Sequence, residues 1–233
     1  WSRKKLTNDF FVTAQKNNAK YFQVPFITDP EKDIQLLNDS LRLKKPIQVL
    51  HYTPLLAQKT IKTVPTDTLL KIMMSRSDNF YAEQIVLMSS AQLLGRMDDA
   101  AFVDSMIQQE FTFLPQPMRW ADGSGLSRYN LNTPENYIAI LKQMQAKYGE
   151  SRVRNIFEKG GEGTLSAYYI NFPGTLYAKT GTLGGQIALS GFIYTKRQQK
   201  LYFSVLVANH MSKTSAAVRR AVEAYLMEIA KRN

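Results

Sequence analysis

The sequence predicts an α/β fold of the α+β type, in which several helices precede an antiparallel sheet that a C-terminal helix covers. Three observations lead to this prediction: helical spacing of apolar residues in the middle of the chain, β-rich segments after Gly174, and an amphipathic stretch at the end. The 233 residues, 44% of them hydrophobic, can form one large domain or two small ones. Collagen-like, disulfide-scaffold and disordered classes are excluded by this composition.

The first 45 residues carry a weak pattern, and we expect a leader or a remnant of an inserted region there. Within them, apolar residues at helical spacing predict a helix over residues 30–43. We expect the domain itself to span residues 46–233 and to begin with short strands at residues 46–51 and 60–64. No repeat, low-complexity tract or Pro/Gly/Ser-rich linker divides it.

Capping residues divide the middle of the chain into helices. The first should end near Ser75, because Ser77-Asp78-Asn79 are residues that cap and turn rather than propagate a helix. Thr133 as an N-cap, with Pro134 at the first helical position, begins the last of this group. The predicted helices cover about residues 65–75, 78–94, 100–111 and 133–148.

After Gly174 the pattern becomes strand-like. Residues 175–179, 188–195 and 200–208 are rich in β-branched and aromatic side chains, and the short connection between the last two predicts an antiparallel hairpin. Residues 215–231 predict an amphipathic helix. Its apolar stripe, suited to lie on the sheet, consists of Val218, Val222, Leu226 and Ile229.

Composition also limits the chemistry. The absence of cysteine excludes disulfides, thiolate catalysis and Cys-ligated zinc, and two distant histidines, His51 and His210, do not suggest a metal site. We therefore predict neither a metal nor another cofactor.

The formal charge of +11 is concentrated at the two ends of the chain, in short clusters that lack the interleaved aromatic residues of nucleic-acid binding. We expect a cationic surface that favours anionic partners, and no nucleic acid. No apolar run approaches the roughly 18 residues of a membrane span, so the chain is expected to be soluble. It starts with Trp1 rather than Met, which favours a piece of a longer protein.

Lys179-Thr180-Gly181-Thr182 stands at the end of a predicted strand. It combines a fixed positive charge, two hydroxyl groups and a glycine that allows a substrate backbone to lie close, a combination suited to a terminal carboxylate. A surface lysine before a turn would explain the tetrapeptide equally well on its own. Ser77-Asp78-Asn79, taken alone, would be a plain helix cap.

Together and in this order, the two elements match two of the three motifs of penicillin-binding proteins and serine β-lactamases, where a Ser-x-x-Lys nucleophile accompanies them. From about Leu69 onward the chain resembles the D-Ala-D-Ala carboxypeptidase/endopeptidase family of low-molecular-mass class C penicillin-binding proteins (DacB-like, peptidase family S13). Further segments that carry the resemblance are Asp122-Gly123-Ser124-Gly125-Leu126-Ser127-Arg128-Tyr129-Asn130 and Gly161-Glu162-Gly163-Thr164-Leu165. The glycine-rich character of the former favours turn support over substrate contact.

The resemblance implies a transpeptidase-like fold, an acyl-serine mechanism, and two ligands: peptidoglycan stem peptides ending in D-Ala-D-Ala, and β-lactam antibiotics. It implies that Ser77 relays a proton to the leaving nitrogen and that Asn79 orients the substrate amide. Lys179, Thr180 and Thr182 would hold the terminal carboxylate, and the Thr182 N–H would serve as an oxyanion donor. Gly181, the remaining substrate-binding residue, would let the substrate backbone lie close. It also implies export to the bacterial periplasm or cell envelope.

The nucleophile is the missing part. Ser2 is the only serine with a lysine three residues later, Lys5, and a chain end is a poor place for a buried catalytic serine. We therefore expect a C-terminal portion of a DD-peptidase, inactive alone unless the N-terminal part of the same protein supplies the serine. The alternatives are a serine β-lactamase relative, which lacks support because no Glu-x-x-Leu-Asn element lies between Ser77 and Lys179, and a non-catalytic peptidoglycan-binding protein.

Overall fold

The structure is a computed structural model that describes residues 2–3, 10–11, 28–41, 45, 47 and 64–232. The chain divides into two compact units, Trp1–Thr60 and Ile61–Asn233. The boundary expected between residues 45 and 46 stays a prediction.

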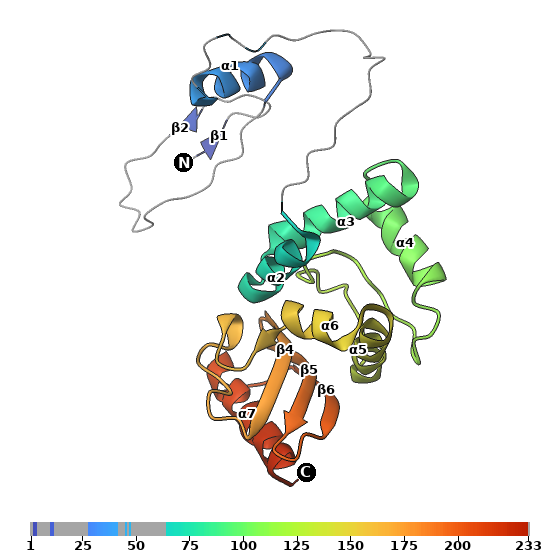
Figure 1. Cartoon of the computed structure of the whole chain (residues 1–233), viewed down its shortest axis with the longest axis vertical. Helices are drawn as coiled ribbons and strands as arrows, with labels where there is room; N and C mark the ends of the chain where they lie inside the picture. The colour runs from blue at the N-terminus through green and yellow to red at the C-terminus, as the bar shows by residue number, and fades with distance from the viewer. Residues whose placement is uncertain are drawn as a thin grey trace. The chain divides into compact units, whose positions relative to one another are not determined.

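The first unit contains a short strand pair and one helix. Strand β1 (Ser2–Arg3) pairs antiparallel with β2 (Phe10–Phe11), and α1 (Pro30–Leu41) follows, drawn in blue in Figure 1. Asp29 caps α1, since its Oδ1 accepts a hydrogen bond from the Lys32 N–H at 2.8 Å. The predicted helix is thus confirmed over residues 30–41, and the last two residues of the expected range lie outside the described residues. The strands predicted at 46–51 and 60–64 fall almost entirely outside the described residues.

The second unit begins with helices, and all four that the capping residues predict are confirmed. They are α2 (Thr66–Arg76), α3 (Asn79–Leu94), α4 (Asp99–Gln109) and α5 (Pro134–Tyr148). The Thr133 hydroxyl accepts a hydrogen bond from the Asn136 N–H at 3.3 Å, as an N-cap should. Helix α6 (Glu150–Ile156) was not predicted, because seven residues are too few to show a helical period.

A four-stranded antiparallel sheet follows, in the order β3 (Glu158–Lys159), β4 (Gly174–Leu183), β5 (Gln186–Thr195) and β6 (Lys200–Ala208). One prediction is wrong here: β4 does not end at Lys179 but continues to Leu183. The reason is a two-residue hairpin turn, Gly184-Gly185, which lets Leu183 pair with Gln186. Gly185 has a φ of +74°, a backbone conformation that favours glycine. The Lys179 tetrapeptide therefore lies inside a strand.

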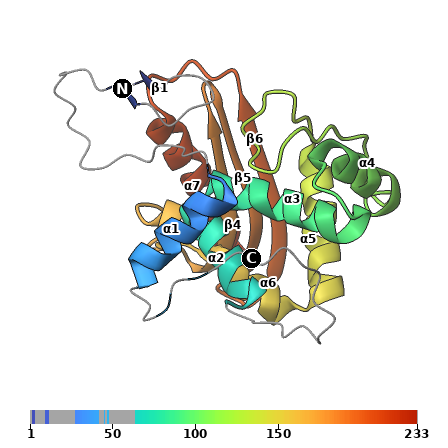
Figure 2. The same ribbon diagram turned by 90° about the horizontal axis from the view of Figure 1, so that it is seen from above.

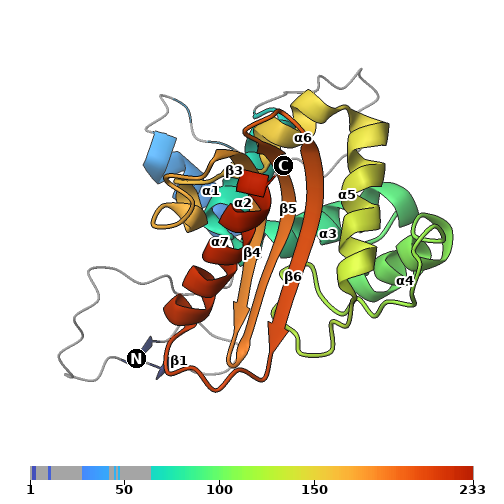
Figure 3. The ribbon, with the colours of Figure 1, turned by 90° about the horizontal axis from the view of Figure 1, so that it is seen from below.

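The sheet separates two layers of helices. Helix α7 (Ser215–Arg232) covers one face, while α5 and α6 cover the other around the fully buried ring of Phe192 (Figures 2 and 3). The first face buries Leu176, Ala178, Leu189, Ile193 and Phe203 against Val222, Leu226 and Ala230. Of the predicted stripe on α7, Val222, Leu226 and Ile229 pack on the sheet and Val218 is half-buried. The α+β architecture is confirmed.

None of the helices in the described part of the chain combines the length and the hydropathy that a bilayer crossing requires.

Candidate active site

The two sequence motifs meet where the α2–α3 turn approaches β4. The Lys179 ammonium donates a hydrogen bond to Ser77 Oγ at 2.8 Å, which joins residues 102 positions apart. It donates a second hydrogen bond to the Thr180 carbonyl, also at 2.8 Å. An ammonium group has three donors. Within the described residues the third has no acceptor, so it is available to a ligand.

Ser77 owes its position to the way in which α2 ends. Its backbone is left-handed, with φ 51° and ψ 50°. The Ser77 N–H bonds the Met74 carbonyl at 3.4 Å and the Asp78 N–H bonds the Met73 carbonyl at 3.0 Å, a Schellman motif with serine where glycine is usual. Asp78 then caps α3 by accepting from the Tyr81 N–H at 3.0 Å. The turn that links two helices therefore also holds the Ser77 hydroxyl against Lys179.

Asn79 is the first residue of α3 and is exposed. In the part of the chain that the structure describes, its side chain has no hydrogen-bond partner. The structure therefore leaves this amide beside, but outside, the Ser77–Lys179 contact. Its role in orienting a substrate stays a prediction.

Lys179 lies in a partly buried setting with one carboxylate nearby. Burial lowers the pKa of the Lys179 ammonium, because the charged form loses hydration, and the negative charge of Glu158 opposes that shift. Glu158 itself is only 4% exposed. Sequence reasoning missed this carboxylate, since nothing in the local pattern shows that β3 brings it into the interior beside β4.

Glu158 begins a chain of hydrogen bonds that reaches Thr180. Glu158 Oε2 accepts from the Thr164 N–H at 2.6 Å and from Thr164 Oγ1 at 3.0 Å, and Thr180 Oγ1 donates to Thr164 Oγ1 at 2.9 Å. An ionised carboxylate only accepts, so both hydroxyl protons point toward Glu158. Thr180 therefore offers lone pairs, not a proton, to any further partner.

Gly163, in the 3-10 turn η1 (Gly163–Leu165), allows this arrangement. Its φ is +45°, and a Cβ atom there would lie 1.8 Å from Glu158 Oε1. No side chain fits at that distance, so the buried carboxylate requires glycine at this position. Packing against Glu158 thus explains why glycine stands at position 163 of the Gly-Glu-Gly-Thr-Leu segment.

The side chains of Thr180 and Thr182 lie on the face of β4 opposite to that of Lys179, because strand residues alternate. This face is the one that α7 covers. There, Arg219 Nη2 donates a hydrogen bond to Thr182 Oγ1 at 2.6 Å. From the sequence, Arg219 is only one of the clustered basic residues near the C-terminal end of the chain. Gly181 shares the side of Lys179, and an added methyl group would lie 3.3 Å from Ala188 Cβ across the hairpin.

The backbone of β4 has an open edge beyond Lys179. The Gly160 N–H donates to the Leu176 carbonyl at 2.9 Å, so the backbone groups of the even-numbered residues of β4 point away from β5. Strand β3 ends at Lys159. Among the described residues, the Thr182 N–H therefore faces no neighbouring strand, which is the situation an oxyanion donor or a substrate-binding edge requires.

The 122–130 loop joins the site to α3 and to the β4–β5 hairpin. The Asp122 carboxylate accepts from the Gly125 and Ser127 N–H groups, each at 2.6 Å, and from the Asn130 side chain at 2.9 Å. Glu83 on α3 accepts from the Gly123 and Ser124 N–H groups at 3.0 and 2.9 Å, and Arg128 donates to the Gly184 carbonyl at 3.2 Å. These bonds support the turn-forming role expected for this loop.

In the described residues no cluster of His, Asp or Glu has the composition of a metal site.

Comparison with known proteins identifies relatives of this chain. Residues 37–232 match the model of the D-Ala-D-Ala carboxypeptidase 3 (S13) family. The chain is 31% identical over 159 residues to D-alanyl-D-alanine carboxypeptidase DacB of Haemophilus influenzae, covering 64% of this chain and 32% of that protein. It is 28% identical over 151 residues to penicillin-sensitive carboxypeptidase A of Dictyostelium discoideum, covering 57% of this chain and 28% of that protein. The chain thus spans about a third of the length of these relatives.

The fold agrees with this result. The crystal structure of penicillin binding protein 4 (dacB) from Haemophilus influenzae superposes with a TM-score of 0.62 at 27% identity, covering 70% of this chain and 39% of that one. The expected penicillin-binding-protein fold is therefore confirmed. Since the family match covers most of the sequence, including both motifs and the whole sheet, the chain belongs to the D-Ala-D-Ala carboxypeptidase (S13) family.

Proposed function

We propose that this chain carries the proton-relay and carboxylate-binding part of a serine-type D-alanyl-D-alanine carboxypeptidase/endopeptidase. Its substrates are peptidoglycan stem peptides, and it takes part in penicillin binding. The observation that carries the proposal is the 2.8 Å contact between Ser77 Oγ and Lys179 Nζ, made by two motifs 102 residues apart. Two relatives whose names describe carboxypeptidases support it.

A peptide ending in D-Ala-D-Ala binds along the open edge of β4. Its terminal carboxylate takes the free donor of Lys179 and the hydroxyl of Thr182, and its scissile carbonyl takes the Thr182 N–H. Thr180 contributes to the same subsite through its backbone, while Gly181 keeps that stretch of strand free of a side chain. Asn79, at the start of α3, orients the substrate amide.

Ser77 transfers the proton in this scheme. Lys179 donates to Ser77 Oγ, so the hydroxyl proton of Ser77 is directed elsewhere and can be given to the leaving nitrogen. When the nucleophilic serine bonds to the carbonyl carbon, the C–N bond breaks and the departing D-alanine amine gains that proton. Ser77 recovers a proton from the nucleophile, whose own proton is lost in the attack.

The nucleophile comes from a segment outside these 233 residues. Ser2 is the only serine followed by a lysine at the required spacing, Lys5, and its charged neighbours Arg3 and Lys4 do not suit the buried helix start that a nucleophilic serine requires. That the chain spans about a third of its relatives' length supports this placement. We expect that fluorescent penicillin does not label the isolated chain. Covalent labelling that maps to any residue of it would refute the missing-nucleophile argument.

Carboxylate recognition can be tested on the chain itself. Binding of N-acetyl-D-Ala-D-Ala and of its C-terminal amide is measured by NMR titration for the wild type, Lys179→Met and Lys71→Met. Lys71 is an exposed lysine on α2, so its replacement removes the same charge away from the site. The acid should bind more tightly than the amide, and only Lys179→Met should lose that preference. Equal affinity of the wild type for the two ligands would refute the proposal.

Two other functions are distinguished by experiments on the complete polypeptide. Rapid turnover of penicillin would indicate a β-lactamase, and slow release a peptidase. A complete sequence without a Ser-x-x-Lys element would indicate a non-catalytic peptidoglycan-binding protein. We place the protein in the bacterial periplasm or envelope, where its proposed substrate lies, and cell fractionation tests that placement.

A further inference from the structure

The two threonine hydroxyls of the β4 tetrapeptide have opposite hydrogen-bonding polarity. The Thr180 proton is committed to Thr164, which in turn donates to Glu158. Thr182 Oγ1, in contrast, accepts a hydrogen bond from Arg219 Nη2 at 2.6 Å. A guanidinium has donors only. The Thr182 proton must therefore point away from Arg219, toward some other acceptor.

We propose that Arg219 on α7 is a positioning residue that fixes the Thr182 hydroxyl as a donor to the terminal carboxylate of the bound peptide. This inference rests on the proposed function. It assigns the preference for an acid-ended ligand to a residue of the C-terminal helix, in addition to Lys179. Thr180 has the same side chain two positions earlier, yet it cannot take this role while its proton is held by the Glu158 chain.

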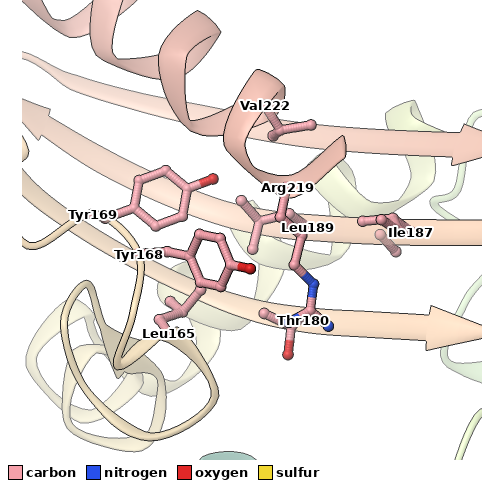
Figure 4. A pocket seen from close by; sticks show the side chains of 9 residues that line it. Leu165, Tyr168, Tyr169, Thr180, Ile187, Leu189, Arg219 and Val222 are labelled. Carbon is pink, nitrogen blue, oxygen red and sulfur yellow. The ribbon is translucent and has the colours of Figure 1, made fainter. Parts of the chain in front are cut away.

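Arg219 is held in place by packing rather than by an acid. Figure 4 shows its side chain extending from α7 toward β4, beside Tyr168, in the cavity that Leu165, Thr180, Leu189 and Val222 also line. Its guanidinium carbon lies 5.7 Å from the centre of the Tyr168 ring. In the part of the chain that the structure describes, no carboxylate pairs with Arg219. No acid among these residues therefore competes with Thr182 for the Arg219 guanidinium.

Arg220 provides a matched comparison. It lies over the same Tyr168 ring, at 4.5 Å, but it forms an ion pair with Glu223 at 2.6 Å, and within the described residues no hydrogen bond joins it to Thr182. Replacing either arginine removes one positive charge and one cation–π contact at Tyr168, and replacing Arg220 also removes its ion pair with Glu223. Only the replacement of Arg219 removes the hydrogen bond that orients the Thr182 hydroxyl.

The test compares the affinities of Arg219→Met, Arg220→Met and the wild type for N-acetyl-D-Ala-D-Ala and for its C-terminal amide. Arg219→Met should weaken binding of the acid about tenfold and leave the amide unchanged, whereas Arg220→Met should keep the acid affinity within about threefold. Arg219→Lys, which keeps the charge and a donor, should recover part of the loss. Circular dichroism and amide NMR spectra establish that each variant is folded. Arg219→Met should keep the wild-type spectra, because Arg219 is only partly buried.

A double-mutant cycle with Thr182→Val separates positioning from direct contact. If Arg219 acts through the hydroxyl, Arg219→Met should cause no further loss in the Thr182→Val background. Additive losses would show that Arg219 acts on the ligand itself and would refute the positioning role. If the wild type prefers the acid and Arg219→Met binds the acid with the same affinity as the wild type, this inference alone is overturned. A wild type without any preference would overturn the proposed function as well.

Discussion

The carboxylate of Asp122 should be a main source of stability for the 122–130 loop. It accepts three hydrogen bonds, two from backbone N–H groups at 2.6 Å and one from Asn130 at 2.9 Å. Asp122→Asn keeps the size of the side chain but has one acceptor oxygen instead of two. If that oxygen takes the place of Oδ1, the new amide nitrogen meets the Ser127 N–H, and that hydrogen bond is lost.

The expected cost can be estimated bond by bond. A hydrogen bond to a charged group contributes about 1.5 to 3 kcal/mol, and a neutral one about 1 kcal/mol. The low end of the first range applies, because Asp122 is only half-buried. One bond is lost and the other two become bonds to a neutral group, so the free energy of unfolding should fall by about 2 to 3 kcal/mol. For a chain of this size, this corresponds to a decrease in Tm of roughly 5 to 10 °C.

Equilibrium urea unfolding, followed by circular dichroism, measures this change. The control is Asp104→Asn on α4, an exposed aspartate without a hydrogen-bond partner in the described residues, which should change the free energy of unfolding by less than about 0.5 kcal/mol. If the two variants are equally stable, the carboxylate of Asp122 does not hold the loop, and the reasoning fails.

Three further predictions follow from the site. Ser77→Gly should be about 1 kcal/mol more stable toward urea than Ser77→Ala, because both lose the hydroxyl but only alanine keeps the left-handed strain; equal stability would mean that this backbone is unstrained. The lowered pKa of Lys179 predicts that affinity for acid-ended peptides falls as the pH rises, starting below the usual lysine range. Over the same interval the free energy of unfolding should rise, since the unfolded chain binds more protons than the folded one. NMR titration of the Lys179 side chain would contradict both expectations if this group titrates in the usual lysine range. Gly163→Ala should displace Glu158, because the added methyl group would overlap the carboxylate, and should destabilise the fold by at least about 2 kcal/mol in thermal unfolding. The control is Gly95→Ala, which introduces left-handed strain but no overlap, since nothing lies within 4 Å of the added atom. A similar cost for both would show that Glu158 moves aside freely.

The helices could be predicted from the sequence because their ends depend on neighbouring residues. Asp78 and Thr133 cap helices through bonds to residues three positions later, and such bonds are present wherever the local sequence permits them. The end of β4, in contrast, was predicted wrongly. Strand length depends on pairing with a partner, and the pairing of Leu183 with Gln186 is made by the Gly184-Gly185 turn, a hairpin signal that the predicted strand end left out.

The candidate site divides in the same way. The residue types and the order of the two motifs sufficed to predict the family and to choose Ser77 and Lys179. Tertiary structure alone brought these two side chains within 2.8 Å, placed Glu158 in the interior, and directed Arg219 to Thr182. The reason is physical. Caps and turns depend on bonds between near neighbours, whereas burial, charge proximity and the direction of a hydroxyl proton depend on which distant segments pack together.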